Sequence, residues 1–206
     1  SKCEKSNKVH RPSLMIFSLP ISFELENEVI LNSANKLLPL MAEGVQKLAV
    51  SGADFIVIPC NTAHVLINEL RETSGVPILS IIEETVKEIK KTGIRKVGIL
   101  ATTETIKRKL FDNILSKAAI DLIKPNNLNQ KKISKMILEI LKRKHKGKIR
   151  TELIKIVRKL VENGAQAIIL GCTDLSLVLN EKNTGIKLFD TTDILANSAV
   201  RKLDGE

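Results

Sequence analysis

The 206-residue chain carries 33 Lys and Arg against 23 Asp and Glu, a formal net charge of +10, and 43% of its residues are hydrophobic. This composition is ordinary for a globular protein, and the length allows one large domain or two lobes of about 100 residues. No apolar run approaches the ~20 residues of a membrane-spanning helix and no signal peptide opens the sequence, so we expect no membrane partner. Three widely spaced cysteines do not form a disulfide framework, which favours a cytoplasmic location.

The positive charge is concentrated in one segment. Residues 131–150 hold nine Lys or Arg and one Glu, which leaves the rest of the chain nearly balanced. The lysines alternate with apolar residues at helical spacing, as on the solvated face of an amphipathic helix. With five Phe and no Trp or Tyr, the chain has little with which to stack bases. We therefore expect no nucleic-acid partner, and a solvated helix that attracts a small anion fits the pattern better.

Short apolar runs alternate with amphipathic segments, which indicates βαβ units and a parallel sheet. In the first half we expect a buried strand at 13–19 and a helix over 26–50, which is interrupted near Pro39 and ended by Gly52. Further strands are expected at 54–59 and 76–81, and further helices over 62–75 and 83–93. The last of these helices has acids in its first turn and lysines in its last, which matches the helix dipole.

The pattern then restarts, which predicts a second α/β lobe. Strands are expected at 96–102, 120–123, 165–171 and 186–190, and helices over 104–118, 149–163, after Cys172 and over 191–203. A turn at 125–130 leads into the basic helix, and a threonine is expected to cap the final helix.

A repeated motif stands at matching places in the two halves. Gly52 precedes Cys60 by eight positions and Gly164 precedes Cys172 by eight; each cysteine follows an apolar run and has a threonine close behind it. In an open parallel sheet, ligands bind at the carboxyl ends of strands, where helix N-termini also point. If the lobes face each other through a pseudo-twofold axis, the two thiols meet across one cleft.

Two thiols on opposite sides of one carbon form a base and an acid. A thiol near a helix N-terminus has its pKa lowered, which favours the thiolate. Removing a proton from one face of a carbon and returning one to the other face inverts a stereocentre. This chemistry needs neither metal nor cofactor, provided that hydrogen-bond donors stabilise the charge that develops on a substrate carboxylate. The local candidates are Asn61, Thr62 and Thr173.

Other interpretations of the cysteines are weaker. A lone cysteine at a strand end is usually a buried small hydrophobe, but two in repeated contexts favour chemistry. No metal site is expected, because no Cys-x-x-Cys or Cys/His cluster accompanies them. Cys3 lies in a polar terminus, and His64 fits either an orienting or a packing role.

The residues around the two cysteines resemble the aspartate/glutamate racemase family of cofactor-independent amino-acid racemases. The segments PCNTAH at 59–64 and GCTDL at 171–175 are similar to that family's two catalytic motifs, and further similarity lies at 98–105, 125–130 and 189–200. The resemblance implies two similar α/β lobes with the active site between them, commonly in a homodimer. The C-terminal helix of the family often returns to the first lobe, which implies lobes of residues 1–91 plus 192–206 and of residues 92–191.

By this resemblance, Cys60 and Cys172 are the two acid/base residues and no cofactor takes part. The amino acid's carboxylate and ammonium would be held by Asn61, Thr62, Thr102, Thr105 and Thr173. The leucine after GCTD stands where cell-wall glutamate racemases have His-Tyr-Pro, which favours the aspartate branch and an acidic amino acid as the small-molecule partner.

The chain departs from the family pattern at three places. Family members begin with a strand and a Gly-Gly-Met-Gly turn, so we expect either ~30 further residues upstream or a pocket without that strand. Aspartate racemases often carry a Pro-Asp-Arg segment whose arginine holds the side-chain carboxylate, whereas here residues 20–26 read PISFELE, with Leu25 near that position. Finally, Asp174 replaces the commoner Glu, and Glu104 replaces the usual glycine.

These departures leave alternatives beside the leading hypothesis, an aspartate racemase acting by two-thiol proton transfer. Lys142, in the basic stretch, is a further candidate for holding a second carboxylate. The alternatives are a related isomerase or decarboxylase, which often keeps only one of the cysteines, and a catalytically silent binding protein or fragment with the same fold.

Overall fold

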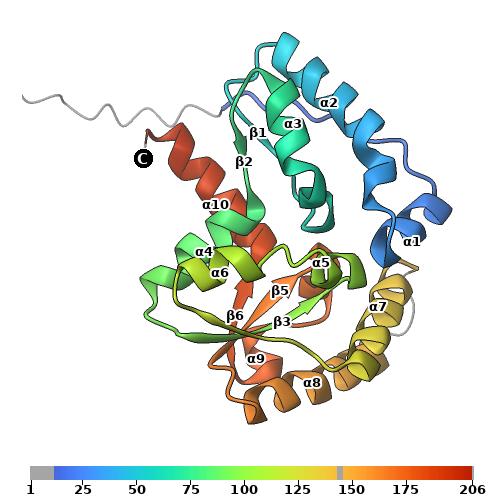
Figure 1. The fold of residues 1–206 in the computed structure, drawn as a ribbon, viewed down its shortest axis with the longest axis vertical. Helices are drawn as coiled ribbons and strands as arrows, with labels where there is room; N and C mark the ends of the chain where they lie inside the picture. Colours follow the sequence, from blue (N-terminus) through green and yellow to red (C-terminus); the bar gives the residue numbers. More distant parts are fainter. Residues whose placement is uncertain (1–11, 143–145, 206) are drawn as a thin grey trace, which may run out of the picture.

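The structure of the chain, a computed structural model, describes residues 12–142 and 146–205. It contains two parallel sheets flanked by helices (Figure 1), which is the α/β class predicted from the sequence. The smaller sheet pairs β1 (Ile56–Val57) with β2 (Ile78–Leu79). The larger has the order β4-β3-β5-β6, with β3 (Lys96–Ala101), β4 (Asp121–Ile123), β5 (Ala167–Gly171) and β6 (Lys187–Asp190).

The smaller lobe is mostly helical. Its elements are α1 (Phe23–Leu31), the 3₁₀ turn η1 (Ala34–Leu37), α2 (Leu38–Val50), the 3₁₀ turn η2 (Thr62–Leu66) and α3 (Ile67–Ser74). Ser22 caps α1 by accepting from the Leu25 N–H at 3.2 Å. The helix expected over 26–50 is interrupted between α1 and α2, and Pro39 lies in the first turn of α2, where its missing N–H costs nothing.

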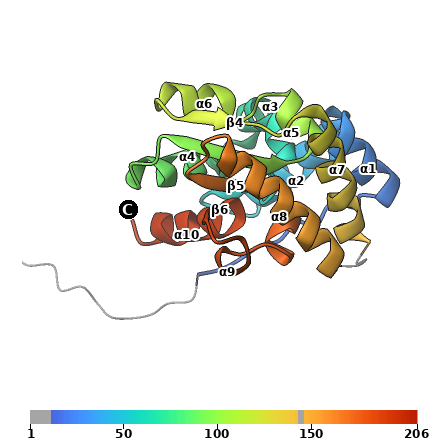
Figure 2. The ribbon, with the colours of Figure 1, turned by 90° about the horizontal axis from the view of Figure 1, so that it is seen from below.

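Helices cover both faces of the larger sheet. They are α4 (Ile81–Lys91), α5 (Thr103–Lys107), α6 (Asp112–Lys117), α7 (Asn127–Leu141), α8 (Lys146–Glu162), α9 (Glu181–Thr184) and α10 (Thr191–Leu203), with the 3₁₀ turn η3 (Thr173–Leu177) after β5. Because side chains alternate along a strand, Leu100 packs toward α7 and α8, whereas Ile99 packs toward α4 and α10. Figure 2 shows α6 and α8 on opposite sides of the sheet.

The strand order creates the position for a ligand site. β3 lies between β4 and β5, and all neighbouring strands are parallel. The direction of winding therefore changes between β3 and β5, and the carboxyl ends of these strands form the switch point at which open α/β sheets bind ligands. Thr102 follows β3 directly and Cys172 follows β5. A Cβ on Gly171 would lie 3.0 Å from that of Ala101, so glycine is needed for this close packing.

The strand predicted at 13–19 is wrong. Residues 12–20 form no regular structure, and Leu14 and Ile16 are 79% and 80% exposed. A strand is stable only beside a partner strand, and within the described ranges this segment pairs with neither β1 nor β2. The segment instead lies along α2, where a Cβ on Gly44 would come within 2.6 Å of the Phe17 ring.

Several predicted boundaries also differ from the structure. The helix expected over 104–118 is divided into α5 and α6, because Lys109 between them has a left-handed backbone with φ 54°. The final helix is capped by Asp190, whose carboxylate accepts from the Thr192 N–H at 2.9 Å, and not by a threonine. Most of the turn expected at 125–130 is the first turn of α7, which Asn126 caps.

The core packing bears on how the lobes are divided. Apolar residues of α4 and α10, among them Ile82, Val86 and Leu195, belong to one cluster with the larger sheet. The division into residues 1–91 plus 192–206 and residues 92–191 stays a prediction.

No helix within the described part of the chain is both long and apolar enough to span a membrane.

Candidate active site

A cavity of about 120 Å³ lies where the two lobes meet. Polar side chains reach it from the turn after β1, from the end of β3, from the end of β5 and from α1: Cys60, Asn61, Thr62, Thr102, Cys172, Thr173, Asp174 and Glu26. An apolar wall completes it: Ile21, Val29, Ile30, Leu37 and Leu141. The volume is well below the roughly 300–1,000 Å³ of pockets for drug-sized ligands, and it suits a molecule of amino-acid size.

All but two of the residues predicted for the site line this cavity. Thr105 is almost fully buried and lies behind Thr102, to which it is hydrogen-bonded. Lys142 is exposed at the end of α7, with its Nζ 4.6 Å from the centroid of the Phe23 ring. The catalytic and substrate-binding roles of all eight residues stay predictions. Across the described ranges, no group of three or more His, Cys, Asp or Glu side chains is placed to hold a metal ion.

Both cavity thiols favour the protonated state. Burial raises the pKa of the Cys60 thiol, although the N–H groups of Ala63 and Thr62 act to lower it. Burial raises the pKa of Cys172 well above its ordinary value, and the neighbouring carboxylate of Asp174 raises it further. The expectation of a lowered thiol pKa is therefore wrong for both cysteines, because desolvation outweighs the N–H groups of the turns.

Asp174 is the immediate polar partner of Cys172. The Cys172 thiol donates to Oδ2 of Asp174 across 3.6 Å. Burial raises the pKa of Asp174, while the hydrogen bond from Cys172 lowers it. The carboxylate is thus placed to accept the proton when Cys172 becomes a thiolate.

The orientation of the Asn61 amide is fixed from behind the cavity. The Thr191 hydroxyl donates its single proton to the Leu170 carbonyl at 2.9 Å, so toward Asn61 it can only accept. Asn61 Nδ2 donates to it at 2.9 Å, and Asn61 Oδ1 is left buried without a partner among the described residues. A buried acceptor without a partner costs about 1–3 kcal/mol, so this oxygen is prepared for a donor such as an ammonium group.

We expect Thr191→Val to weaken substrate binding. The variant removes the acceptor of the Asn61 amide, so the amide is free to turn its NH₂ group toward the ligand. KM should rise about 10-fold or more, on the scale of one hydrogen bond to a charged group, while Thr191→Ser should restore it. Steady-state kinetics beside a thermal melt measures both effects. An unchanged KM in a folded Thr191→Val variant would show that Thr191 does not orient the amide.

Three threonine hydroxyls join the two lobes beside the cavity. The Oγ1 atoms of Thr62 and Thr102 are 2.9 Å apart, and that of Thr105 lies 2.9 Å from Thr102. Thr102 also caps α5 by accepting from the Thr105 N–H at 3.2 Å. The Thr102 hydroxyl donates its proton to Thr105, so it accepts from Thr62, and the cluster holds both side chains at the cavity wall.

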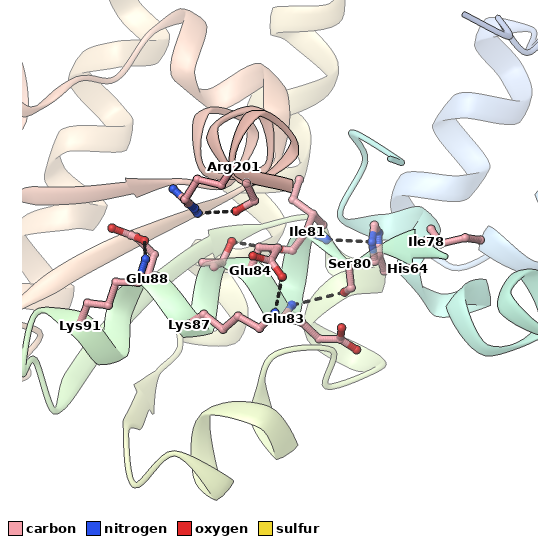
Figure 3. A network of polar contacts seen from close by, with 12 residues as sticks. His64, Ile78, Ser80, Ile81, Glu83, Glu84, Lys87, Glu88, Lys91 and Arg201 are labelled. Atoms are coloured by element: carbon pink, nitrogen blue, oxygen red, sulfur yellow. Dashed lines mark hydrogen bonds and ion pairs between the residues drawn. The ribbon is translucent and has the colours of Figure 1, made fainter. Parts of the chain in front are cut away.

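His64 is hydrogen-bonded to Ile81 at the start of α4 (Figure 3), and it also contacts the turn that carries Cys60. Its Nδ1–H donates to the Cys60 carbonyl at 2.8 Å, and its Nε2 accepts from the Ile81 N–H at 3.1 Å. These two bonds require the neutral imidazole, because Nε2 must keep its lone pair. Burial lowers the pKa of His64 to about 4, and the charge of Arg71 acts in the same direction. His64 therefore has a positioning role and does not line the cavity.

Sequence reasoning did not identify Glu26 and Thr191 as site residues. Glu26 lies on α1 between residues that the sequence presents as an ordinary helix face, and Thr191 stands outside both cysteine motifs. Asp174 was noted as a departure from a family pattern, but not as a cavity residue. Glu104, the other departure, is fully buried and accepts from the Arg108 Nε at 3.0 Å, away from the cavity lining.

Comparison with known proteins gives one family. A family model described as Asp/Glu/Hydantoin racemase matches residues 15–199. The chain is 31% identical over 202 residues to the broad specificity amino-acid racemase of Bacillus subtilis (strain 168), covering 96% of this chain and 86% of that one.

Solved structures share the fold. An aspartate racemase homologue from Pyrococcus horikoshii OT3 superimposes with a TM-score of 0.77 at 25% identity, covering 98% of this chain and 88% of that chain. The Picrophilus torridus aspartate racemase gives a TM-score of 0.71 at 25% identity, covering 79% of this chain and 67% of that chain.

Proposed function

Because the chain belongs to the Asp/Glu/Hydantoin racemase family and is a cofactor-independent amino-acid racemase, an isomerase, we propose that it inverts the α-carbon of a free amino acid by proton transfer between Cys60 and Cys172. The observation that carries this mechanism is that the two cysteines line one small cavity from different lobes. Cys60 follows the small sheet and Cys172 follows the large one, which supports an approach to the substrate from two sides.

Each step of the mechanism conserves protons and charge. One cysteine, as thiolate, takes the α-proton and becomes a thiol, and the electron pair of the broken C–H bond delocalises into the substrate carboxylate. The other cysteine, as thiol, donates its proton to the opposite face and becomes a thiolate. The Thr173 hydroxyl would donate to the carboxylate and stabilise the added charge, and Thr62 and Thr102 would join it by turning their protons away from the bonds within the threonine cluster.

The substrate's ammonium group supports the ionisation of a thiol. The unpartnered Oδ1 of Asn61 is its acceptor in this proposal. A positive charge brought into the cavity favours the thiolate and offsets the burial that raises the pKa of Cys60 and Cys172. For Cys172, Asp174 is the group that would receive the proton.

The mechanism does not by itself specify the side chain of the substrate. The sequence predicts aspartate, and the likeness to an aspartate racemase of known structure supports an acidic amino acid. The lining of the cavity does not favour this choice, since its charged groups are the carboxyl groups of Glu26 and Asp174. Aspartate therefore enters the test as one of several candidate substrates.

The proposal is tested by incubating the protein with single enantiomers of acidic, neutral and basic amino acids and separating the products by chiral chromatography. Enantiomers have equal free energy, so a racemase must bring the L and the D form of its substrate to the same 1:1 mixture. A folded protein that inverts none of these amino acids would overturn the proposal, and release of CO₂ would indicate the decarboxylase alternative.

A further inference from the structure

The charged groups around the cavity are of one sign. Glu26 reaches it from α1 and Asp174 from η3, while no described Lys, Arg or His side chain lines it. Neither carboxylate forms an ion pair within 4 Å with a residue of the described ranges. Carboxylates that are partly removed from water without a cation are unfavourable, so a positively charged group of a ligand would be stabilised beside them.

The two carboxylates also act on each other. Glu26 and Asp174 line one cavity, and burial raises the pKa of Glu26 while the charge of Asp174 raises it further. When Cys60 is the thiolate, the proposed mechanism adds a third negative charge to the cavity. When Cys172 is the thiolate, its proton passes to Asp174 and the number of charges is unchanged. A ligand that brings another carboxylate would increase this repulsion, whereas a cation would relieve it.

A cation that pairs with Glu26 would be a second positive group, in addition to the α-ammonium group of the substrate. Asn61, which lines the same cavity, carries a separate buried acceptor, Oδ1, and Thr191 fixes the orientation of its amide. The proposed mechanism assigns Asn61 Oδ1 to the ammonium and threonine hydroxyls to the carboxylate, and neither assignment uses the carboxylate on α1. Lys142, the residue predicted to hold a second carboxylate, is exposed and lies over Phe23.

We propose that the preferred substrates are amino acids with a cationic side chain, of the lysine, ornithine or arginine type, and that Glu26 is the specificity-determining residue that receives the side-chain cation. Asp174 adds negative potential from the opposite lobe while remaining the partner of Cys172. This inference rests on the proposed racemase function, since it assigns the substrate of the same cavity.

The test compares L-lysine, L-aspartate and L-methionine as substrates of the wild type, Glu26→Gln and Glu24→Gln. Methionine is the uncharged reference of similar length. Glu24 is a matched control, because it lies on the same helix and is exposed, away from the cavity lining. In the wild type, kcat/KM for lysine should exceed that for methionine by about 10- to 100-fold, the range expected for a hydrogen bond between charged groups.

Glu26→Gln should lower the lysine-to-methionine ratio about 10-fold or more, and Glu24→Gln should leave it unchanged. Faster turnover of aspartate than of lysine by the wild type would overturn the inference and leave the racemase proposal intact. An unchanged lysine-to-methionine ratio of kcat/KM in Glu26→Gln would also overturn the inference.

Calorimetric binding of lysine and aspartate to the wild type separates the two proposals. Binding of lysine that Glu26→Gln weakens, without inversion of any amino acid, would support the choice of ligand and overturn the racemase proposal. Binding of neither amino acid would overturn the inference.

Discussion

Replacing Cys60 or Cys172 with alanine is expected to lower kcat for racemisation by about 100- to 10,000-fold in both directions, the range that a positioned acid or base contributes. Each turnover needs one group to remove the α-proton and a second to deliver a proton to the other face. The loss of either thiol therefore stops inversion from the L and from the D side alike. Initial rates for both enantiomers measure the effect.

The two single variants should also differ from each other in a specific way. With one thiol left, a proton can be removed and returned only on one face, so α-proton exchange is expected for one enantiomer without inversion. Cys60→Ala and Cys172→Ala should exchange opposite enantiomers. Cys3→Ala is the matched control and should keep wild-type kcat, because Cys3 belongs to neither cysteine motif. Near wild-type racemisation by either cavity variant would contradict the mechanism.

Stability is expected to fall as the pH decreases from about 6.5 to 4, because His64 cannot accept a proton in the folded protein. Its pKa is about 4 when folded and 6.5 when exposed, so protons bind the unfolded chain first and favour it. A difference of this size corresponds to about 3 kcal/mol, which is fully present as stability above pH 6.5 and is lost as the pH falls to 4.

Denaturant unfolding of the wild type and of His64→Asn at a series of pH values isolates this contribution. Carboxyl groups titrate in both proteins, so their effects cancel in the difference between the two free energies of unfolding. That difference should shrink by about 3 kcal/mol between pH 7 and pH 4. A difference that stays constant with pH would show that His64 is not held neutral by its bonds to Cys60 and Ile81.

The sequence predicted the central strands and the turns after them because both signals are local. Ile99 and Ile169 lie in apolar runs of strand length that become buried on both faces of the larger sheet. Each apolar run that carries a cysteine ends in polar residues, a pattern that predicts a site at Cys60 and Cys172. Both now line one cavity, while their catalytic roles remain part of the proposal.

What the sequence did not predict depends on long-range packing. The apolar run at 13–19 has the composition of a buried strand, but only the tertiary structure shows that no strand lies beside it. The break at Lys109 lies in a charged stretch that carries no glycine or proline signal. The contact of Thr191 with Asn61 joins residues 130 positions apart, and Glu26 has the pattern of a solvated helix position until the other lobe encloses it.

The most direct test of a two-base mechanism follows deuterium during the first turnovers in D₂O. One enantiomer is supplied, the two enantiomers are separated by chiral chromatography, and each is analysed for deuterium at the α-carbon by mass spectrometry. The account predicts that the newly formed enantiomer carries deuterium, whereas the remaining starting enantiomer keeps its hydrogen. Equal labelling of both enantiomers from the start would mean that a single group serves both faces, and it would contradict the assignment of Cys60 and Cys172 as a pair.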